Sequence, residues 1–209
     1  MVFNLLSIVA LAATTLAIFG RYKNKKLHYF TKPLAILSII LIALILYPGN
    51  DVNYSQLIIA GLLFSMAGDV FLMFEERFFL FGLISFFITH VFYSYAFLNI
   101  ETISFNPWLI IVMIVIAIII GRQIIPRAGE LKIPVTLYIL VIMIMVWLSW
   151  ERYLGLPDSA TLMAVVGTSF FLISDTLLAW NKFVKKFESA EFFILLTYFT
   201  AQWFIAMSI

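Results

Sequence analysis

A series of long apolar runs restricts the fold of this chain more than any other feature of its sequence. Charged residues make up 11% of the chain, whereas a soluble domain has about 25%. Backbone groups in lipid must be hydrogen-bonded within the protein, and runs of this length favour helices over the short alternating strands of a membrane barrel. We therefore expect an all-α, polytopic membrane protein that forms one transmembrane domain over residues 1–209. The predicted spans are Val2–Gly20, Pro33–Tyr47, Gln56–Phe74, Phe78–Leu98, Pro107–Ile120, Pro134–Trp150, Thr161–Trp180 and Ser189–Ser208.

The basic residues are distributed unevenly between the connections of these spans. Twelve of the 13 Lys and Arg residues fall in the first, third, fifth and seventh connections, and only Arg152 falls in an even-numbered one. Because positive charge accumulates on the cytoplasmic side of a membrane protein, we expect the odd-numbered connections to be cytoplasmic and both termini to lie outside, in the cell membrane. The net charge of +2 is explained by this orientation, and it predicts no nucleic-acid partner.

Two of the predicted spans share a motif. The stretch Gly61-x-x-Phe64-x-x-x-Gly68-Asp69-x-x-Leu72 recurs 106 residues later as Gly167-x-x-Phe170-x-x-x-Ser174-Asp175-x-x-Leu178. The third and seventh spans cross in the same direction, so the recurrence predicts two parallel four-helix halves, at about 1–104 and 105–209. Small residues such as Gly61, Ser65 and Gly68 share one helix face, which lets a neighbouring helix approach closely in lipid.

Asp69 and Asp175 lie well inside two of the predicted spans. Asp69 precedes Arg77 by eight residues and Asp175 precedes Lys182 by seven, which places both carboxyl groups about 10–12 Å from the cytoplasmic edge. An ionisable group at that depth is costly unless it is paired or neutralised, and equal depth on equivalent helices predicts a shared site. Two carboxyl groups in a low-dielectric site can divide into a protonated acid and an ionised base. The alternative is that each Asp only joins helices through hydrogen bonds.

Seven further polar residues are candidates for substrate binding. Lys32, at the start of the second predicted span, could attract a phosphate or a carboxylate, or could mark only the cytoplasmic side. His90 and Tyr93 share a face of the fourth span, where His90 is either catalytic or a hydrogen-bonded structural residue. The others could bind a polar head group or water: Tyr138, Asn181, Tyr198 and Gln202. Because the chain has no cysteine and a lone His is a poor metal site, we expect no disulfide, no metal and no cofactor.

These motifs resemble those of the lysoplasmalogenase-type membrane proteins, the YhhN-like family. The resemblance covers nearly the whole chain, and the two Asp motifs are its most diagnostic part. It is carried by Thr31-Lys32-Pro33, Gly68-Asp69, His90-x-x-Tyr93, Pro134-x-x-x-Tyr138, Gly167-x-x-Phe170-x-x-x-Ser174-Asp175, Leu178-Ala179-Trp180-Asn181-Lys182-Phe183 and Thr197-Tyr198-x-x-x-Gln202. It implies an eight-helix fold, catalysis by Asp69 and Asp175, and hydrolysis of the vinyl ether bond of a lysoplasmalogen to a fatty aldehyde and a glycerophospho-head group. The implied partners are this lysophospholipid substrate and the surrounding membrane lipids.

Three other functions fit parts of the pattern. Parallel repeats and buried carboxylates also occur in proton-coupled or lipid transporters. Intramembrane aspartyl proteases use two buried Asp residues as well, but they resemble a Gly-x-Gly-Asp pattern that Met66 and Ser174 interrupt here. A purely structural or partner-binding membrane protein would tolerate Asp→Asn at both positions. The hydrolase is favoured because vinyl ether cleavage needs one acid, one base and negative charge beside a cationic transition state, as two carboxyl groups provide in glycosidases.

Overall fold

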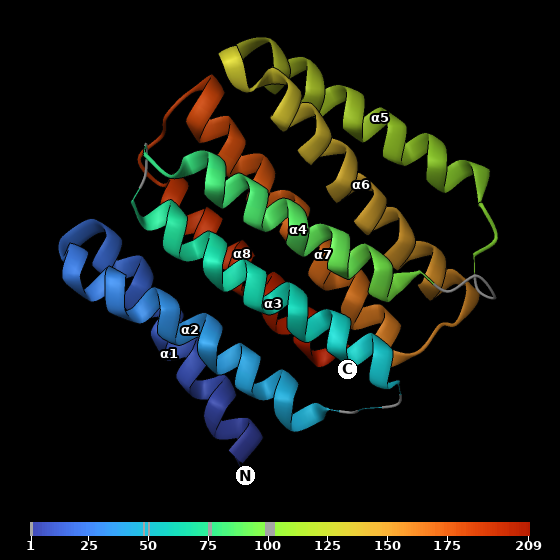
Figure 1. Ribbon diagram of the computed structural model, residues 1–209, viewed down its shortest axis with the longest axis horizontal. Helices are drawn as coiled ribbons and strands as arrows, with labels where there is room; N and C mark the ends of the chain where they lie inside the picture. Colours follow the sequence, from blue (N-terminus) through green and yellow to red (C-terminus); the bar gives the residue numbers. More distant parts are fainter. Residues whose placement is uncertain (1, 48, 50, 75–76, 99–102) are drawn as a thin grey trace.

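The computed structural model describes residues 2–47, 49, 51–74, 77–98 and 103–209. Within these ranges eight helices are long and apolar enough to cross a membrane, and no strand occurs, so the all-α membrane class is confirmed. The helices lie side by side in one bundle (Figure 1). They are α1 (Val2–Lys23), α2 (Lys25–Leu46), α3 (Val52–Met73), α4 (Phe79–Phe97), α5 (Pro107–Ile124), α6 (Lys132–Gly155), α7 (Ser159–Ala179) and α8 (Ala190–Met207). A π-helical turn, Trp180–Val184, follows α7.

The start of α2 corrects the prediction that Pro33 begins the second helix. The helix begins at Lys25, where the side chain of Asn24 caps it by accepting hydrogen bonds from two backbone N–H groups of the first turn. Pro33 lies inside the helix, where it lacks the N–H for one helical hydrogen bond; membrane helices tolerate such a proline when neighbouring groups satisfy the freed carbonyl. The consequence is that Lys32 lies within α2, not at its first residue, and is buried.

α6 extends beyond Trp150, where the predicted span ends. The extension contains a buried carboxyl group. The helix continues to Gly155, and Glu151 within it is 0% exposed. The Glu151 carboxylate accepts hydrogen bonds from the backbone N–H of Ser104 at 3.1 Å and of Asn106 at 2.7 Å. Since a carboxylate can accept several hydrogen bonds, Glu151 anchors the segment that leads into α5.

The helix contacts follow the same order in both halves of the chain. α2 packs against α3 and α6 packs against α7, while α3 pairs with α4 and α7 pairs with α8. The contacts between the halves are also equivalent: the fourth helix of each half packs on the second helix of the other, α4 on α6 and α8 on α2. This arrangement supports our proposal that residues 1–104 and 105–209 are parallel repeats.

Glycines on α3 and α7 allow the close helix pairs that the motif predicts. A Cβ atom at Gly68 would lie 2.7 Å from the Phe86 ring of α4. A Cβ atom at Gly167 would lie 2.9 Å from the carbonyl oxygen of Ala201 in α8. Because these distances are too short for a side chain, glycine lets each pair of helices approach closely where lipid supplies no hydrophobic driving force.

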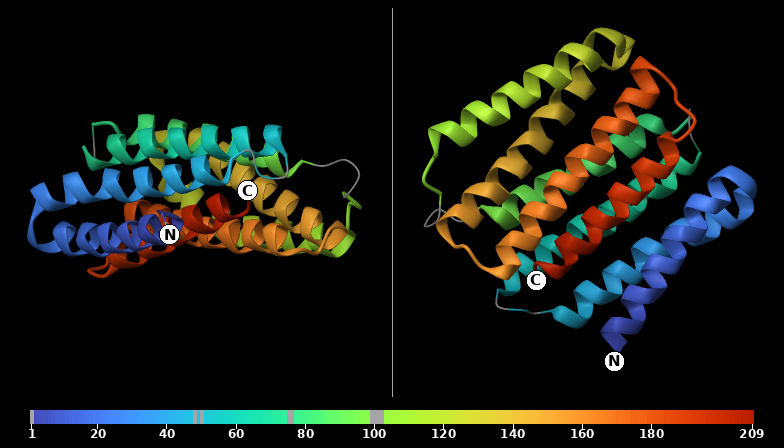
Figure 2. Two further views of the ribbon diagram at one scale, coloured as in Figure 1. Left: turned by 90° about the horizontal axis from the view of Figure 1, so that it is seen from below. Right: turned by 180° about the vertical axis from the view of Figure 1, so that it is seen from behind.

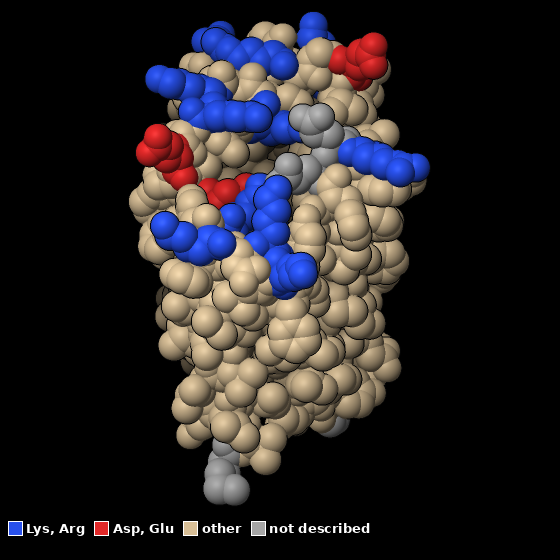
Figure 3. Space-filling model, turned by 90° about the vertical axis from the view of Figure 1, so that its left-hand side faces the viewer, with Lys and Arg blue, Asp and Glu red and all other residues tan. Residues whose placement is uncertain are grey.

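Lys and Arg side chains gather at one end of the bundle (Figure 3). This end, which we call the basic end, carries the α1–α2, α3–α4, α5–α6 and α7–α8 connections, whereas α1 begins and α8 ends at the opposite end (Figures 1 and 2). We propose that the basic end faces the cytoplasm, because positive charge accumulates on that side of a membrane.

This orientation predicts that an impermeant thiol reagent labels Asn4→Cys, and not Lys25→Cys, in intact cells. Both positions are exposed, and the chain contains no competing cysteine. Labelling of Lys25→Cys after lysis serves as the control for its reactivity. The opposite labelling pattern in intact cells would place the basic end outside.

Candidate active site

A polar cavity lies at the basic end of the bundle, and its empty space, with the open solvent at its mouth included, is about 1020 Å³. In Figure 3 a hollow is visible there between the blue side chains. Side chains from α1, α2, α3, α4, α7 and α8 form its walls, together with the turn that follows α7. Asp69 of α3 and Asp175 of α7 both line it. The structure therefore brings the two carboxyl groups into one site.

Asp69 is held in a buried ion pair. Lys32 Nζ of α2 lies 3.0 Å from Asp69 Oδ1, and the Tyr198 hydroxyl of α8 donates a hydrogen bond to Oδ2 at 2.7 Å. The side chains of Lys32 and Asp69 are only 8% and 2% exposed. Removing either partner would leave an uncompensated buried charge, so Lys32 and Asp69 hold each other in position.

Asp175 has different partners. The Tyr138 hydroxyl of α6 donates a hydrogen bond to Asp175 Oδ2 at 2.5 Å, and Nε2 of His90, from α4, lies 3.5 Å from the same oxygen. The latter distance is too long for a strong hydrogen bond. The Asp175 side chain is 11% exposed, more than that of Asp69. One carboxyl group of the site is thus paired with a cation, and the other is held mainly by a phenol.

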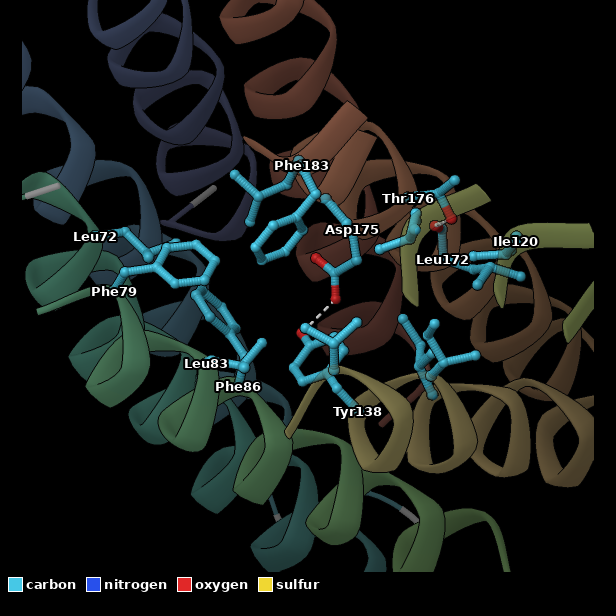
Figure 4. Close-up of a pocket in the computed structure, with 16 residues that line it drawn as sticks. Leu72, Phe79, Leu83, Phe86, Ile120, Tyr138, Leu172, Asp175, Thr176 and Phe183 are labelled. Carbon is cyan, nitrogen blue, oxygen red and sulfur yellow. Dashed lines mark hydrogen bonds between the residues drawn. The ribbon is translucent and has the colours of Figure 1, made fainter. Parts of the chain in front are cut away.

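A second, apolar cavity adjoins the polar one, and its empty space, open solvent included, is about 610 Å³. It lies between α4, α5, α6 and α7 and is lined by side chains such as Leu83, Ile120 and Leu172 (Figure 4). The two cavities share five lining residues, which are Leu72, Phe79, Phe86, Asp175 and Leu178. Asp175 therefore stands where the polar and apolar cavities meet, while Asp69 lines only the polar one.

The remaining predicted site residues divide into two groups. Asn181 lines the polar cavity, and its side-chain oxygen accepts a hydrogen bond from the backbone N–H of Phe187 at 3.2 Å, which shapes the turn before α8. Tyr93 and Gln202 lie on the walls of neither cavity. Tyr93 donates to Gln202 Oε1 at 2.7 Å, and Gln202 donates to Ser65 Oγ at 2.7 Å. This buried network joins α3, α4 and α8 behind the site.

The polar cavity is also lined by three basic residues. From the sequence alone, these three residues are used only to predict the orientation in the membrane. They are Arg21 of α1 and, after α7, Lys182 and Lys186. Arg21 lies 3.1 Å from Glu191 at the start of α8, and Lys182 Nζ lies 4.9 Å from the Phe79 ring centre. Their position in odd-numbered connections is the one sequence feature that could indicate a place in the site, because a basic residue that orients the chain in the membrane can also line a cavity. Nowhere in the described ranges do three His, Asp or Glu side chains come close enough to hold a metal ion.

Comparison with protein families gives a match to the YhhN family over residues 27–209. The chain belongs to the YhhN family. It is 27% identical over 178 residues to the uncharacterized membrane protein YhhN of Escherichia coli O157:H7, a match that covers 85% of each chain.

Two human relatives have names that state an activity. The chain is 33% identical over 156 residues to lysoplasmalogenase TMEM86A, which covers 72% of this chain and 64% of that protein. It is 28% identical over 160 residues to lysoplasmalogenase TMEM86B, which covers 75% of this chain and 64% of that protein. No solved structure matches the chain.

Proposed function

We propose that this YhhN-family protein is a membrane hydrolase that cleaves the vinyl ether bond of lysoplasmalogens, releasing a fatty aldehyde and a glycerophospho-head group. The observation that carries the proposal is a pair of carboxyl groups in a cation-lined polar cavity, one of which, Asp175, stands where that cavity meets an apolar one. The names of the relatives TMEM86A and TMEM86B agree with this activity.

The two cavities match the two parts of a single-chain phospholipid. The hydrocarbon chain would point toward the apolar cavity, and the head-group phosphate would lie near the Lys182 and Lys186 side chains that line the polar one. Lysine and arginine side chains bind phosphate through charge-assisted hydrogen bonds. The bond between head group and chain then lies beside Asp69 and Asp175. Lys32 lines the same cavity and pairs with Asp69, so we propose that Lys182 and Lys186 attract the phosphate together with it.

The chemistry of a vinyl ether needs the groups that the site contains. Protonation of the carbon next to the oxygen-bearing carbon forms an oxocarbenium ion. Water adds to this ion, and the resulting hemiacetal separates into aldehyde and alcohol. A carboxylic acid can supply the proton, and a carboxylate can stabilise the cation and accept a proton from the water.

The proposal predicts that the purified protein releases aldehyde and glycerophosphoethanolamine from ethanolamine lysoplasmalogen, as measured by mass spectrometry. Two matched lipids, with an ester or a saturated ether in place of the vinyl ether, are expected to remain intact. The ester lacks a carbon–carbon double bond to protonate, and so does the saturated ether. Cleavage of the ester lipid would indicate an acyl hydrolase instead, and recovery of all three lipids would contradict hydrolysis altogether.

A further inference from the structure

We infer that the two carboxyl groups have separate duties: Asp175 donates the proton to the hydrocarbon-side carbon of the vinyl ether, and Asp69 stays ionised beside the oxygen-bearing carbon. This inference rests on the proposed function, and it adds the orientation in which the lipid binds between the two Asp residues. It follows from three differences between the two halves of the bundle.

The first difference lies in equivalent positions of the repeat. The 106 residues that separate Asp69 from Asp175 also separate Lys32 from Tyr138. Lys32 reaches from α2 to the Asp of α3, and Tyr138 reaches from α6 to the Asp of α7. The same place in the architecture thus holds an ammonium group in one half and a neutral phenol in the other.

The second difference is the charge that surrounds each carboxyl group. Across the described ranges, Asp69 has a lysine within ion-pair distance, whereas Asp175 has no Lys or Arg at that distance. The nearest titratable groups to Asp175 are Tyr138 and the buried His90, whose ring packs edge-on against Tyr138 with centroids 5.1 Å apart. Burying an unpaired charge is far more costly than burying a neutral group. Asp69 is therefore the carboxylate of the pair, and Asp175 is the carboxylic acid.

The third difference is that the apolar cavity reaches Asp175 and not Asp69. In the first half α1 packs closely along α2, and a Cβ atom at Gly20 would lie only 2.6 Å from the backbone nitrogen of His28. In the second half α5 is the least buried of the eight helices. Its residue Ile124 forms part of the wall of the apolar cavity. The looser packing of α5 leaves an apolar opening on the Asp175 side, toward which a hydrocarbon chain can point.

These three differences allow only one orientation of the vinyl ether between the two Asp residues. In a vinyl ether the carbon that is protonated lies on the hydrocarbon side, and the oxygen-bearing carbon lies on the head-group side. A lipid with its chain in the apolar cavity presents the first carbon to Asp175 and the second to Asp69. Figure 4 shows that one Asp175 oxygen faces Tyr138 while the other points away, toward Phe183. Because no hydrogen bond to Oδ1 occurs within the described part of the chain, that oxygen is available to carry the transferred proton.

The proton transfers balance over one turnover. The Asp175 proton moves to the carbon as the double-bond electrons form the new C–H bond, and water then attacks the oxygen-bearing carbon while Asp69 accepts one of its protons. Asp69 returns this proton to the departing glycerol oxygen as the carbon–oxygen bond breaks. The hydroxyl proton of the hemiacetal passes to Asp175, which restores both groups. Lys32 and Tyr138 act as positioning residues throughout.

Infrared spectroscopy of the purified resting protein tests this division without turnover. We expect a carbonyl-stretch signal from a buried protonated carboxyl group that is present in the wild type and in Asp69→Asn but lost in Asp175→Asn. Lys32→Met is expected to add a second such signal, because Asp69 without its cation takes up a proton. Asp51→Asn, at the exposed cap of α3, is the matched control and is expected to leave the signal unchanged.

Two outcomes would overturn the inference. One is loss of the signal in Asp69→Asn with retention in Asp175→Asn, which would reverse the assignment. The other is absence of the signal from the wild type, which would mean that both carboxyl groups are ionised. Either result is independent of lipid cleavage, so it is distinct from failure of the proposed hydrolase activity. Monodisperse elution of each variant in detergent confirms that the comparison is between folded proteins.

Discussion

Asparagine at position 69 or 175 is expected to lower the turnover of lysoplasmalogen by about 10³-fold or more. General acid–base catalysis contributes about 10²–10⁴-fold, and each substitution also removes charge or a proton from the same reacting bond. Because the two groups act as a unit, the double variant should be little worse than either single variant. The measurement is aldehyde release per mole of protein, at a lipid concentration above the KM of the wild type.

Asp51→Asn provides the matched control for this prediction. Asp51 caps α3 by accepting hydrogen bonds from the backbone N–H groups of Asn53 and Tyr54, and Asn caps helices about as well as Asp. The control should therefore retain full activity. Wild-type turnover by either Asp69→Asn or Asp175→Asn, in a protein that elutes as a single species, would remove that residue from the mechanism.

The sequence predicts the membrane class and the central carboxyl groups because both depend on local rules. Long apolar runs must be helical in lipid, and a carboxyl group retained at membrane depth needs a partner or a proton. The repeat around Asp69 and Asp175 then indicates that two such groups occupy equivalent helices. These arguments need no knowledge of how the helices pack, and eight membrane-length helices are found.

The partners of each carboxyl group could not be predicted, because they depend on contacts between helices far apart in the sequence. Lys32 was expected at a helix start, but the cap at Asn24 lengthens α2 and carries Lys32 into the bundle. Gln202 was a candidate for binding a head group, yet it lies fully buried with Tyr93 and Ser65. A polar side chain in a span meets its partner across the helix interface, and the sequence does not specify that neighbour.

The two cavities also lie beyond sequence reasoning. Both α1 and α5 are mostly apolar, but the buried face of α1 consists of small residues such as Ala13, Ala17 and Gly20, and this allows close packing on α2. α5 carries bulky isoleucines and buries only Met113, Gly121 and Ile124. The small residues of α1 are a usable signal for tight packing. The space left beside α5 becomes evident only when all its neighbours are in place.

Turnover in D₂O is expected to place a single solvent deuterium on the carbon next to the aldehyde. If a carboxylic acid protonates the double bond, the new C–H bond must come from an exchangeable site, and Asp175 exchanges with solvent between turnovers. The same step should make the reaction slower in D₂O than in H₂O, because the bond to hydrogen forms as the barrier is crossed. The label shows that the aldehyde comes from the vinyl ether, and the slower rate reports on the protonation step itself.

The label must be fixed before the aldehyde enolises and exchanges further. Borohydride present during the reaction reduces the aldehyde to an alcohol, and mass spectrometry of the alcohol then locates the deuterium. A control reaction with added aldehyde, borohydride and the protein in D₂O should show no deuterium at that carbon. Any hydrolysis of a vinyl ether to an aldehyde adds one solvent hydrogen to this carbon, so the label identifies the alcohol as a product of the vinyl ether, and the rate tests the mechanism. Equal rates in H₂O and D₂O would mean that protonation of this carbon does not limit the reaction. Asp175 would then lose its assigned part in the rate-setting step.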